Sequence, residues 1–218
     1  LKVVDGFIFV SRFAYNKHRE SIKELNDSNS IVLHNFNKNT KKNIIFSKKK
    51  YFLFFGRLSH EKGLKTLINA FSNLTSIKLK IVGTGPEEEY LKKLAMDNDA
   101  KNIEFIGYKS GKDLDILISN AFFTIVPSEW WENNPMTIIE SYSFGVPVIG
   151  SRIGGIPEII KDDITGYLFN MGDTAELRKI ILDVHAMSKE MYLKMSDNAF
   201  KFSQENFNEK KHGRNLIN

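Results

Sequence analysis

From residue 51 onward, short apolar runs alternate with helix-like segments, and this alternation restricts the fold more than any other feature of the chain. Each run is four or five residues long and is bounded by Gly, Pro or Ser, which favours buried strands. Repeated strand–helix–strand units predict a doubly wound α/β fold, in which a parallel sheet carries helices on both faces. Strands are expected at residues 51–55, 79–82, 103–106, 122–126 and 146–149, and helices at about 64–74, 87–97, 111–119, 135–144, 173–186 and 188–206.

The first fifty residues have a different character. A strand is expected at residues 4–10, a helix at about 12–25 and a short strand at 31–33, followed by a polar, Lys- and Asn-rich stretch. Six lysines fall within residues 38–50 and carry much of the formal net charge of +5. Such a run is usually a solvated linker, and attraction to anionic lipid head groups or a polyanionic substrate is the functional alternative. Nucleic-acid binding is disfavoured, because the segment has no ladder of aromatic residues for stacking.

Composition excludes several classes of protein. With no Cys in its 218 residues, the chain has no disulfide, thiolate nucleophile or cysteine-ligated metal, which fits a cytoplasmic location. The five His are scattered without ligand spacing, so no metal site is expected. No apolar run approaches the roughly 20 residues that span a bilayer, and the first residues do not resemble a signal peptide.

The loop after the first strand of the alternating region carries two permanent cations, Arg57 and Lys62, ahead of a helix. Gly56 allows the backbone to approach a ligand closely. A helix N-terminus offers free N–H groups and a partial positive charge, so cations beside it favour an anion such as a diphosphate. The alternative is a surface pair between Arg57 and Glu61 with a solvated Lys62, and this loop alone does not decide between the two.

Two further loops are expected to shape the same site. Gly83-Thr84-Gly85-Pro86 follows the second strand, but three glutamates come directly after it and oppose a phosphate. We therefore expect this loop to form a wall of the pocket. Gly107-Tyr108 follows the third strand and allows a flat base to lie against the loop, although a single tyrosine there is also common in ordinary packing.

The segment 127–140 is the richest in ligand-binding groups. Asn134 and Pro135 are predicted to be the N-cap and the first residue of a helix. The first residues of that helix then present free backbone N–H groups, which are donors for a second phosphate contact. These residues are Met136, Thr137 and Ile138.

Two carboxylates flank this helix start. Glu132 precedes the helix, and Glu140 lies about one and a half turns inside it. Ionised carboxylates accept hydrogen bonds from hydroxyl groups, so this arrangement suits a sugar nucleotide. Two alternatives stay open: Glu140 is a half-buried acid paired with a Lys or Arg, or the two carboxylates form a hydrolytic acid–base pair.

These elements, in this order, resemble glycosyltransferase family 4, the group 1 glycosyltransferases of the GT-B architecture. The fold that the resemblance implies is the Rossmann-like C-terminal half of such an enzyme. Each motif is modest alone, and together they are specific. They are Gly56-Arg57 with Glu61-Lys62-Gly63, Gly83-x-Gly85-Pro86, Phe105-Ile106-Gly107, Pro127-Ser128, Glu132 and Glu140 with seven residues between them, Gly145-Val146-Pro147-Val148, Gly154-Gly155-Ile156-Pro157-Glu158 and Thr165-Gly166-Tyr167-Leu168.

The resemblance implies a retaining transfer of sugar from a nucleotide-diphosphate sugar of UDP or GDP type, with no metal or other cofactor. By this analogy Arg57 and Lys62 hold the diphosphate and, with Glu132, are the catalytic residues, while Glu140 binds the ribose. Many relatives have glycines at the positions of Asn133 and Pro135, so the donor sugar is not carried over. The expected donor-binding residues are Gly56, Arg57, Lys62, Gly83, Gly85, Ile106, Gly107, Tyr108, Glu132, Asn133, Asn134, Pro135, Met136, Thr137 and Glu140.

The resemblance also implies a domain organisation. Residues 1–36 correspond to the end of an N-terminal acceptor domain and the crossover from it, and residues 37–50 form the Lys/Asn-rich linker. Residues 51–200 form the nucleotide-sugar-binding domain, and residues 201–218 a helix that packs back on the N-terminal domain. The chain is thus expected to be a fragment that binds the donor but needs the missing domain to reach a glycan or lipid-linked acceptor, with peripheral contact at the inner face of the membrane as a further expectation.

Three other functions compete with this interpretation. A GT-B sugar-nucleotide epimerase shares the donor pocket, and a non-catalytic nucleotide-sugar-binding module needs only that pocket. A Rossmann dehydrogenase is third, because it requires G-x-G-x-x-G after the first strand and an acid about 20 residues further on, and neither is present.

Overall fold

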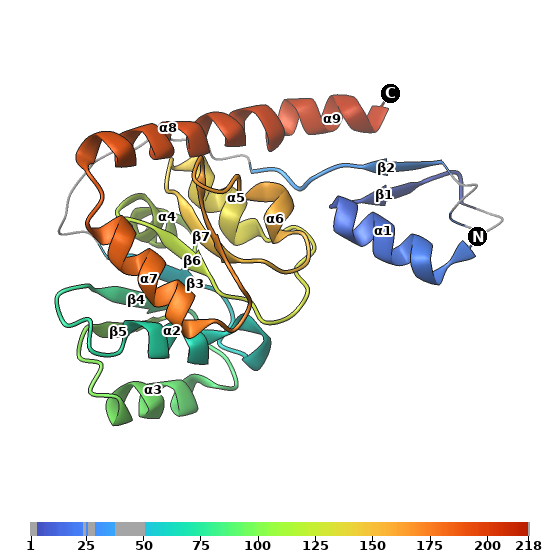
Figure 1. Cartoon of the computed structure of the whole chain (residues 1–218). Coiled ribbons are helices and arrows are strands. Elements are labelled where there is room, and N and C mark those ends of the chain that lie inside the picture. Colours follow the sequence, from blue (N-terminus) through green and yellow to red (C-terminus); the bar gives the residue numbers. More distant parts are fainter. Residues whose placement is uncertain (1–3, 24, 26–28, 38–50, 218) are drawn as a thin grey trace.

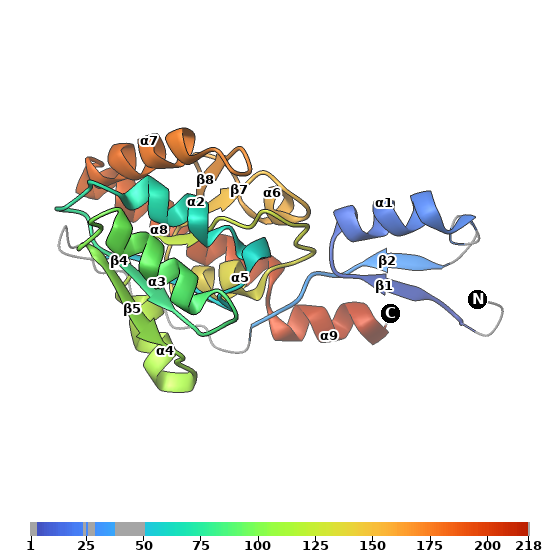
Figure 2. The same cartoon turned by 90° about the horizontal axis from the view of Figure 1, so that it is seen from below.

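The computed structural model describes residues 4–23, 25, 29–37 and 51–217, so the lysine run at 38–50 lies outside the described residues. A small N-terminal unit stands beside a larger α/β domain (Figures 1 and 2). The unit consists of β1 (Phe7–Phe9), α1 (Arg12–Ser21) and β2 (Ser30–Val32). Its two strands pair in parallel with Ile8 opposite Ile31, and Phe9, Ala14 and Leu25 form its small core. Helix α1 ends at Ser21 rather than at residue 25, because Ile22 is extended (φ −128°, ψ 99°).

The larger domain is a six-stranded, fully parallel sheet, which confirms the doubly wound fold. Strand order is β5-β4-β3-β6-β7-β8, in which the chain moves outward from the centre first in one direction and then in the other. The strands are β3 (Phe52–Phe55), β4 (Leu79–Val82), β5 (Ile103–Gly107), β6 (Thr124–Val126), β7 (Val148–Ser151) and β8 (Gly166–Phe169).

Helices cover both faces of this sheet (Figure 1). They are α2 (Leu64–Phe71), α3 (Glu88–Asp97), α4 (Gly111–Ser119), α5 (Met136–Ser143), α6 (Ile156–Ile159), α7 (Thr174–His185) and α8 (Lys189–Asn206), with α9 (Glu209–Ile217) at the end and a 3₁₀ turn at His60–Lys62.

The central strand β3 is buried on both sides because alternate side chains face opposite cores. Phe52 and Phe54 pack in one core with α2, α3 and α7. Leu53 and Phe55 pack in the other, against α4. This explains why β3 reads as a continuous apolar run rather than an alternating one.

Several strands differ from the sequence-based expectation. Strand β6 begins at Thr124 instead of residue 122, and β1 covers only Phe7–Phe9 of the expected residues 4–10. Strand β7 begins at Val148 instead of residue 146, since Pro147 has no N–H for a ladder and Val146 N–H instead bonds Ser141 O at 3.0 Å. Strand β8, a four-residue edge strand that begins with glycine, was not predicted although Tyr167, Leu168 and Phe169 give it an apolar run.

The last helices reach across the molecule. Helix α7 packs on α2 and α8 packs on α5. The boundary expected between residues 200 and 201 lies within α8. This helix ends at Asn206 with Phe207 as its C-cap, and α9 then extends toward the N-terminal unit (Figures 1 and 2). There a ring nitrogen of His212 lies 2.9 Å from the carbonyl oxygen of His34. None of the helices in the described part of the chain is long and apolar enough to cross a bilayer.

Candidate functional site

The strand order itself locates the most favourable ligand site. Strands β3 and β6 are neighbours at the point where the order of the strands reverses, so the loops after them diverge to opposite sides. Ligands in such sheets bind at the carboxyl ends of the strands at this crevice. The loop after β3 begins with Gly56-Arg57, and the loop after β6 leads through Ser128 to Glu132. The two loops with the richest predicted chemistry are therefore adjacent in space.

Two cavities lie against these loops, and both are lined by Phe55 and Gly56. The first has a volume of about 500 Å³. Arg57 and Tyr108 line it from exposed positions, with Tyr108 69% exposed. Its lining is Phe55, Gly56, Arg57, Val82, Thr84, Tyr108, Lys109, Ser110, Gly111, Leu114 and Glu140.

Glu140 is the half-buried acid of this cavity. Burial raises the pKa of its carboxyl above the ordinary value, and the nearby carboxylate of Asp115 raises it further. Glu140 forms no ion pair with any cation in the described part of the chain, so the pairing with Lys or Arg considered above is wrong for these residues. An unpaired, half-buried carboxylate gains most from donors that a ligand brings.

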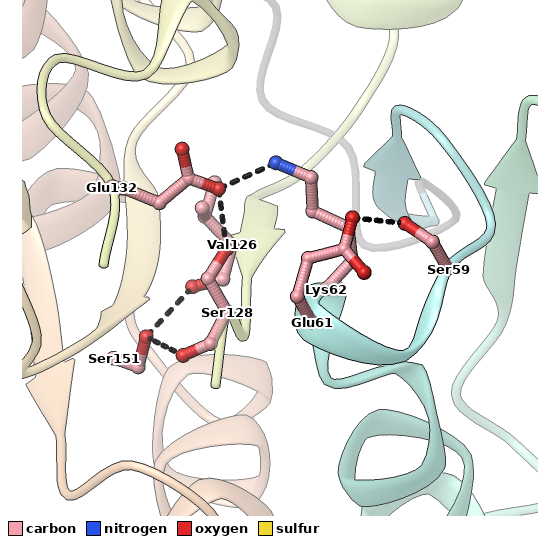
Figure 3. Close-up of polar contacts among 7 residues, drawn as sticks. All are labelled: Ser59, Glu61, Lys62, Val126, Ser128, Glu132 and Ser151. Atoms are coloured by element: carbon pink, nitrogen blue, oxygen red, sulfur yellow. Dashed lines mark hydrogen bonds and ion pairs between the residues drawn. The ribbon is translucent and has the colours of Figure 1, made fainter. Parts of the chain in front are cut away.

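The second cavity is smaller, about 120 Å³, and contains the other acid. Its lining is Phe54, Phe55, Gly56, Lys62, Ile125, Val126, Ser128, Glu132, Pro135, Met136 and Thr137. Lys62 Nζ lies 2.5 Å from Glu132 Oε1 (Figure 3). Ser128 Oγ donates to the same oxygen at 2.9 Å, and Ser128 is held in turn by Ser151, whose hydroxyl donates to its carbonyl at 2.7 Å. Glu132 is thus fixed by a cation and a hydroxyl before any ligand arrives.

The surface pair between Arg57 and Glu61, the alternative considered for this loop, is not formed in the described residues. Ser59 Oγ donates to Glu61 Oε1 at 2.6 Å (Figure 3), and this hydrogen bond is the main reason that the pKa of Glu61 is lowered. Within the described residues Arg57 has no ion-pair partner. Arg57 therefore lines the first cavity without a direct ion-pair partner, although its charge contributes to the lowered pKa of Glu61.

The start of α5 differs from the prediction by one residue. Pro135 is the N-cap, with extended backbone (φ −65°, ψ 120°), and Met136 is the first helical residue. Ile138 N–H donates to Pro135 O at 3.1 Å, so it is not free as expected. Among the described residues, the N–H groups of Met136 and Thr137 have no protein acceptor, and both residues line the second cavity.

Asn134 is not the N-cap because its side chain is used elsewhere. Its Oδ1 accepts a hydrogen bond from Asn35 N–H at 2.9 Å, and its carbonyl accepts from Asn35 Nδ2 at 3.2 Å. Asn134 is buried and ties the crossover segment to the loop after β6.

Six predicted donor-binding residues line neither cavity: Gly83, Gly85, Ile106, Gly107, Asn133 and Asn134. Gly83 and Gly85 lie against backbone, where an added Cβ would come within 1.8 Å of Gly56 O and 2.2 Å of Leu58 O, respectively. Ile106 packs against the core under α4. Gly83 and Gly85 therefore pack against the backbone of the loop that carries Arg57 and do not line a cavity.

Several lining residues were not singled out by the sequence. Lys109, Ser110 and Leu114 follow β5 and help to enclose the first cavity. Thr84 also lines it, from the loop after β4 that was expected to form a wall of the pocket. Ser128 belongs to a motif noted above but had been given no role. These residues could have been found from their place in the chain. Each lies within a few positions of a strand's carboxyl end or at the start of the next helix.

Comparison with known proteins agrees with this geometry. A family model described as "Glycosyl transferases group 1" matches residues 35–202. The chain is 27% identical over 202 residues to an uncharacterized glycosyltransferase of Methanocaldococcus jannaschii, covering 92% of this chain and 55% of the relative. It is 34% identical over 128 residues to a GDP-mannose-dependent alpha-mannosyltransferase of Corynebacterium glutamicum, covering 59% of this chain and 29% of the relative. The chain thus spans about half the length of the first of these relatives and less than a third of the second.

Solved structures share the fold. TarM of S. aureus, in a complex that includes UDP, superposes with a TM-score of 0.87 at 17% identity and covers 99% of this chain and 44% of its own. HepE of Anabaena, in complex with UDP and glucose, has a TM-score of 0.86 at 19% identity, covering 99% and 63%. Both similarities extend over the N-terminal unit as well as the sheet domain.

Proposed function

The chain belongs to the group 1 glycosyl transferases, and from that premise we propose that it forms the donor-binding part of a retaining glycosyltransferase. The donor is a nucleotide-diphosphate sugar of UDP or GDP type. The observation that carries the proposal is the placement of Arg57, Lys62, Glu132 and Glu140 around two adjoining cavities at the crevice between β3 and β6. The UDP complexes of TarM and HepE and the UDP-glucose complex of HepE support it by analogy.

Each part of the donor has a proposed partner. The diphosphate lies between Arg57, Lys62 and the free N–H groups of Met136 and Thr137. The ribose hydroxyls donate to Glu140, and the base lies against Tyr108 in the first cavity. Glu132 receives hydroxyls of the sugar once the diphosphate has drawn Lys62 away from it.

The proposed transfer needs no protein nucleophile. The bond between the anomeric carbon and the phosphate oxygen breaks, and its electron pair stays with the diphosphate. The acceptor hydroxyl attacks from the same face, and its proton passes to the departing phosphate oxygen. Arg57 and Lys62 stabilise the charge that develops on the diphosphate, which is the role that a metal ion plays in other transferases, and no metal enters the proposed step.

The acceptor, a glycan or lipid-linked saccharide, is proposed to bind mainly to a further domain of a longer protein. The N-terminal unit supports this, because its two-stranded parallel sheet leaves Ile8 and Ile31 54% and 44% exposed. Parallel sheets are normally covered on both faces, and two strands alone are marginal. We expect the present chain to bind donor more readily than it transfers sugar. Contact with the inner face of the membrane stays a prediction that rests on residues 38–50, outside the described part.

Calorimetric titration with UDP, GDP, ADP and NAD tests the proposal. We expect UDP or GDP to bind and NAD not to bind. Binding of NAD with none of the three nucleoside diphosphates would contradict it and favour a dehydrogenase. Incubation with sugar nucleotides that carry the nucleoside diphosphate found to bind then distinguishes a transferase part from an epimerase. An epimerase would convert the sugar without an acceptor.

A further inference from the structure

The only two tryptophans of the sequence stand exposed beside the candidate catalytic acid. Trp130 is 68% exposed and Trp131 is 56% exposed, and Glu132 follows them directly. Indole side chains normally bury a large part of their surface, and two adjacent exposed ones form an apolar patch of the kind that marks a binding surface.

Trp131 is held by the N-terminal unit. The ring of Phe13, on α1, meets it edge-on with centroids 5.6 Å apart and planes at 70°. Lys17 Nζ lies 5.5 Å from the centroid of the same indole. Trp130 lies 6.1 Å from Trp131 at a tilt of 35°. We call Phe13, Trp130 and Trp131 the aromatic platform.

A carboxylate of the sheet domain fixes the position of Phe13. Glu158, on α6, accepts hydrogen bonds from the backbone N–H groups of Arg12 at 2.7 Å and Phe13 at 2.5 Å. The hydroxyl of Ser11 accepts from Ala14 N–H at 3.0 Å, so the first three N–H groups of α1 are all satisfied. Helix α1 is thereby anchored to the sheet domain, and Phe13 is positioned before a ligand binds.

We propose that the aromatic platform is a stacking subsite for a saccharide ring of the acceptor, an inference that rests on the proposed function. An acceptor hydroxyl must come within bonding distance of the anomeric carbon, which that function places at Glu132, one residue along the chain from Trp131. A sugar ring has C–H groups on its faces, which can stack on an aromatic ring, and hydroxyl groups at its edge. The charged groups beside the platform, Lys17, Glu132 and Glu158, match that edge.

The fluorescence of the chain reports this surface directly, because no other tryptophan contributes. Lactose, maltose, N,N′-diacetylchitobiose and α-1,2-mannobiose are titrated with and without saturating nucleoside diphosphate. We expect at least one to change the emission in a saturable way. Saturation-transfer NMR then measures the affinity of each variant for that disaccharide. The affinity should fall about two- to tenfold in each of Trp130→Ala, Trp131→Ala and Phe13→Ala.

Tyr90→Ala, which removes an exposed aromatic side chain from α3, is the matched control and should leave saccharide binding unchanged. Nucleoside diphosphate affinity should stay unchanged in the three platform variants. If no disaccharide changes the emission while the nucleotide still binds, the saccharide subsite is refuted and the proposed function stands. An emission change that depends only on protein concentration would assign the platform to contacts between copies and would equally overturn the proposal. Loss of nucleotide binding by the unaltered chain would refute the proposed function itself.

Discussion

Each of the two cavities of the candidate site is lined by a basic and an acidic residue of the predicted site, which form an ion pair in one cavity and not in the other. In the smaller cavity Lys62 and Glu132 neutralise each other at 2.5 Å. In the larger cavity neither Arg57 nor Glu140 forms an ion pair with a described residue, and burial already raises the pKa of Glu140. The difference indicates that the larger cavity is ready for a ligand, whereas the smaller one must exchange an internal partner for an external one.

Lys62→Ala should have the largest effect on binding of a nucleoside diphosphate. The substitution removes a cation and also leaves Glu132 unpaired, so that its carboxylate repels the incoming phosphates. We expect affinity to fall by about 3 kcal/mol, roughly a hundredfold, by calorimetry. Lys65→Ala, on the exposed side of the same helix start, is the control and should bind normally. Unchanged affinity in Lys62→Ala would remove Lys62 from the site.

Arg57→Ala should have a smaller effect, because no internal carboxylate is released when the guanidinium is lost. The expected loss is about 2 kcal/mol, within the range for a hydrogen bond to a charged group. Arg57→Lys should recover only part of it, since an ammonium lacks the planar fork that matches two phosphate oxygens. Full recovery would indicate that only charge matters at this position.

Glu140→Gln should lower affinity for a nucleoside diphosphate and raise the stability of the ligand-free chain at neutral pH. A raised folded pKa means that ionisation of Glu140 opposes folding, so its contribution is favourable below the ordinary value of 4.5 and is lost as pH rises through the folded value. Thermal unfolding should show Glu140→Gln above the unaltered chain at neutral pH. The gap should close below pH 4.5. Identical pH profiles would show that Glu140 is already solvated.

Glu132→Gln should have the smallest effect and the opposite sign. Without its carboxylate partner Lys62 is free for phosphate, so UDP or GDP without a sugar should bind about 0.5 kcal/mol more tightly. The double variant Lys62→Ala with Glu132→Gln should recover part of the loss seen in Lys62→Ala. Weaker binding of the free nucleoside diphosphate to Glu132→Gln would show that Glu132 positions Lys62 for the phosphate and does not compete with the phosphate for it.

Most of the fold follows from local sequence pattern, because each buried strand and amphipathic helix carries its own periodicity. The exceptions are positions where a local signal is weak or overridden. Strand β8 is short and lies at the sheet edge, and the start of α5 moved by one residue because the side chain of Asn134 bonds to Asn35, a residue 99 positions away. Sequence patterns do not report contacts of that separation.

The candidate site was predictable to a similar extent. Arg57, Lys62, Glu132 and Glu140 follow from their positions after strands and from the family resemblance. Their pairing did not, because Lys62 bonds to Glu132 across 70 positions while the nearer Glu61 bonds to Ser59. The hydrogen bond from Arg12 N–H to the Glu158 carboxylate joins residues 146 positions apart and could not be predicted from the sequence either.

The double glycine after β7 has a consequence for engineering the donor preference of such a domain. Gly155 N–H donates to the carbonyl of Glu132 at 2.6 Å, and a Cβ at Gly155 would come within 1.9 Å of Asn133 O. The loop after β6 therefore rests backbone to backbone on the loop after β7, which continues into Glu158 and its hold on α1. A loop transplanted after β6 would keep this support only if its backbone followed the same path, so the stretch from residue 127 to residue 158 is best exchanged as one unit.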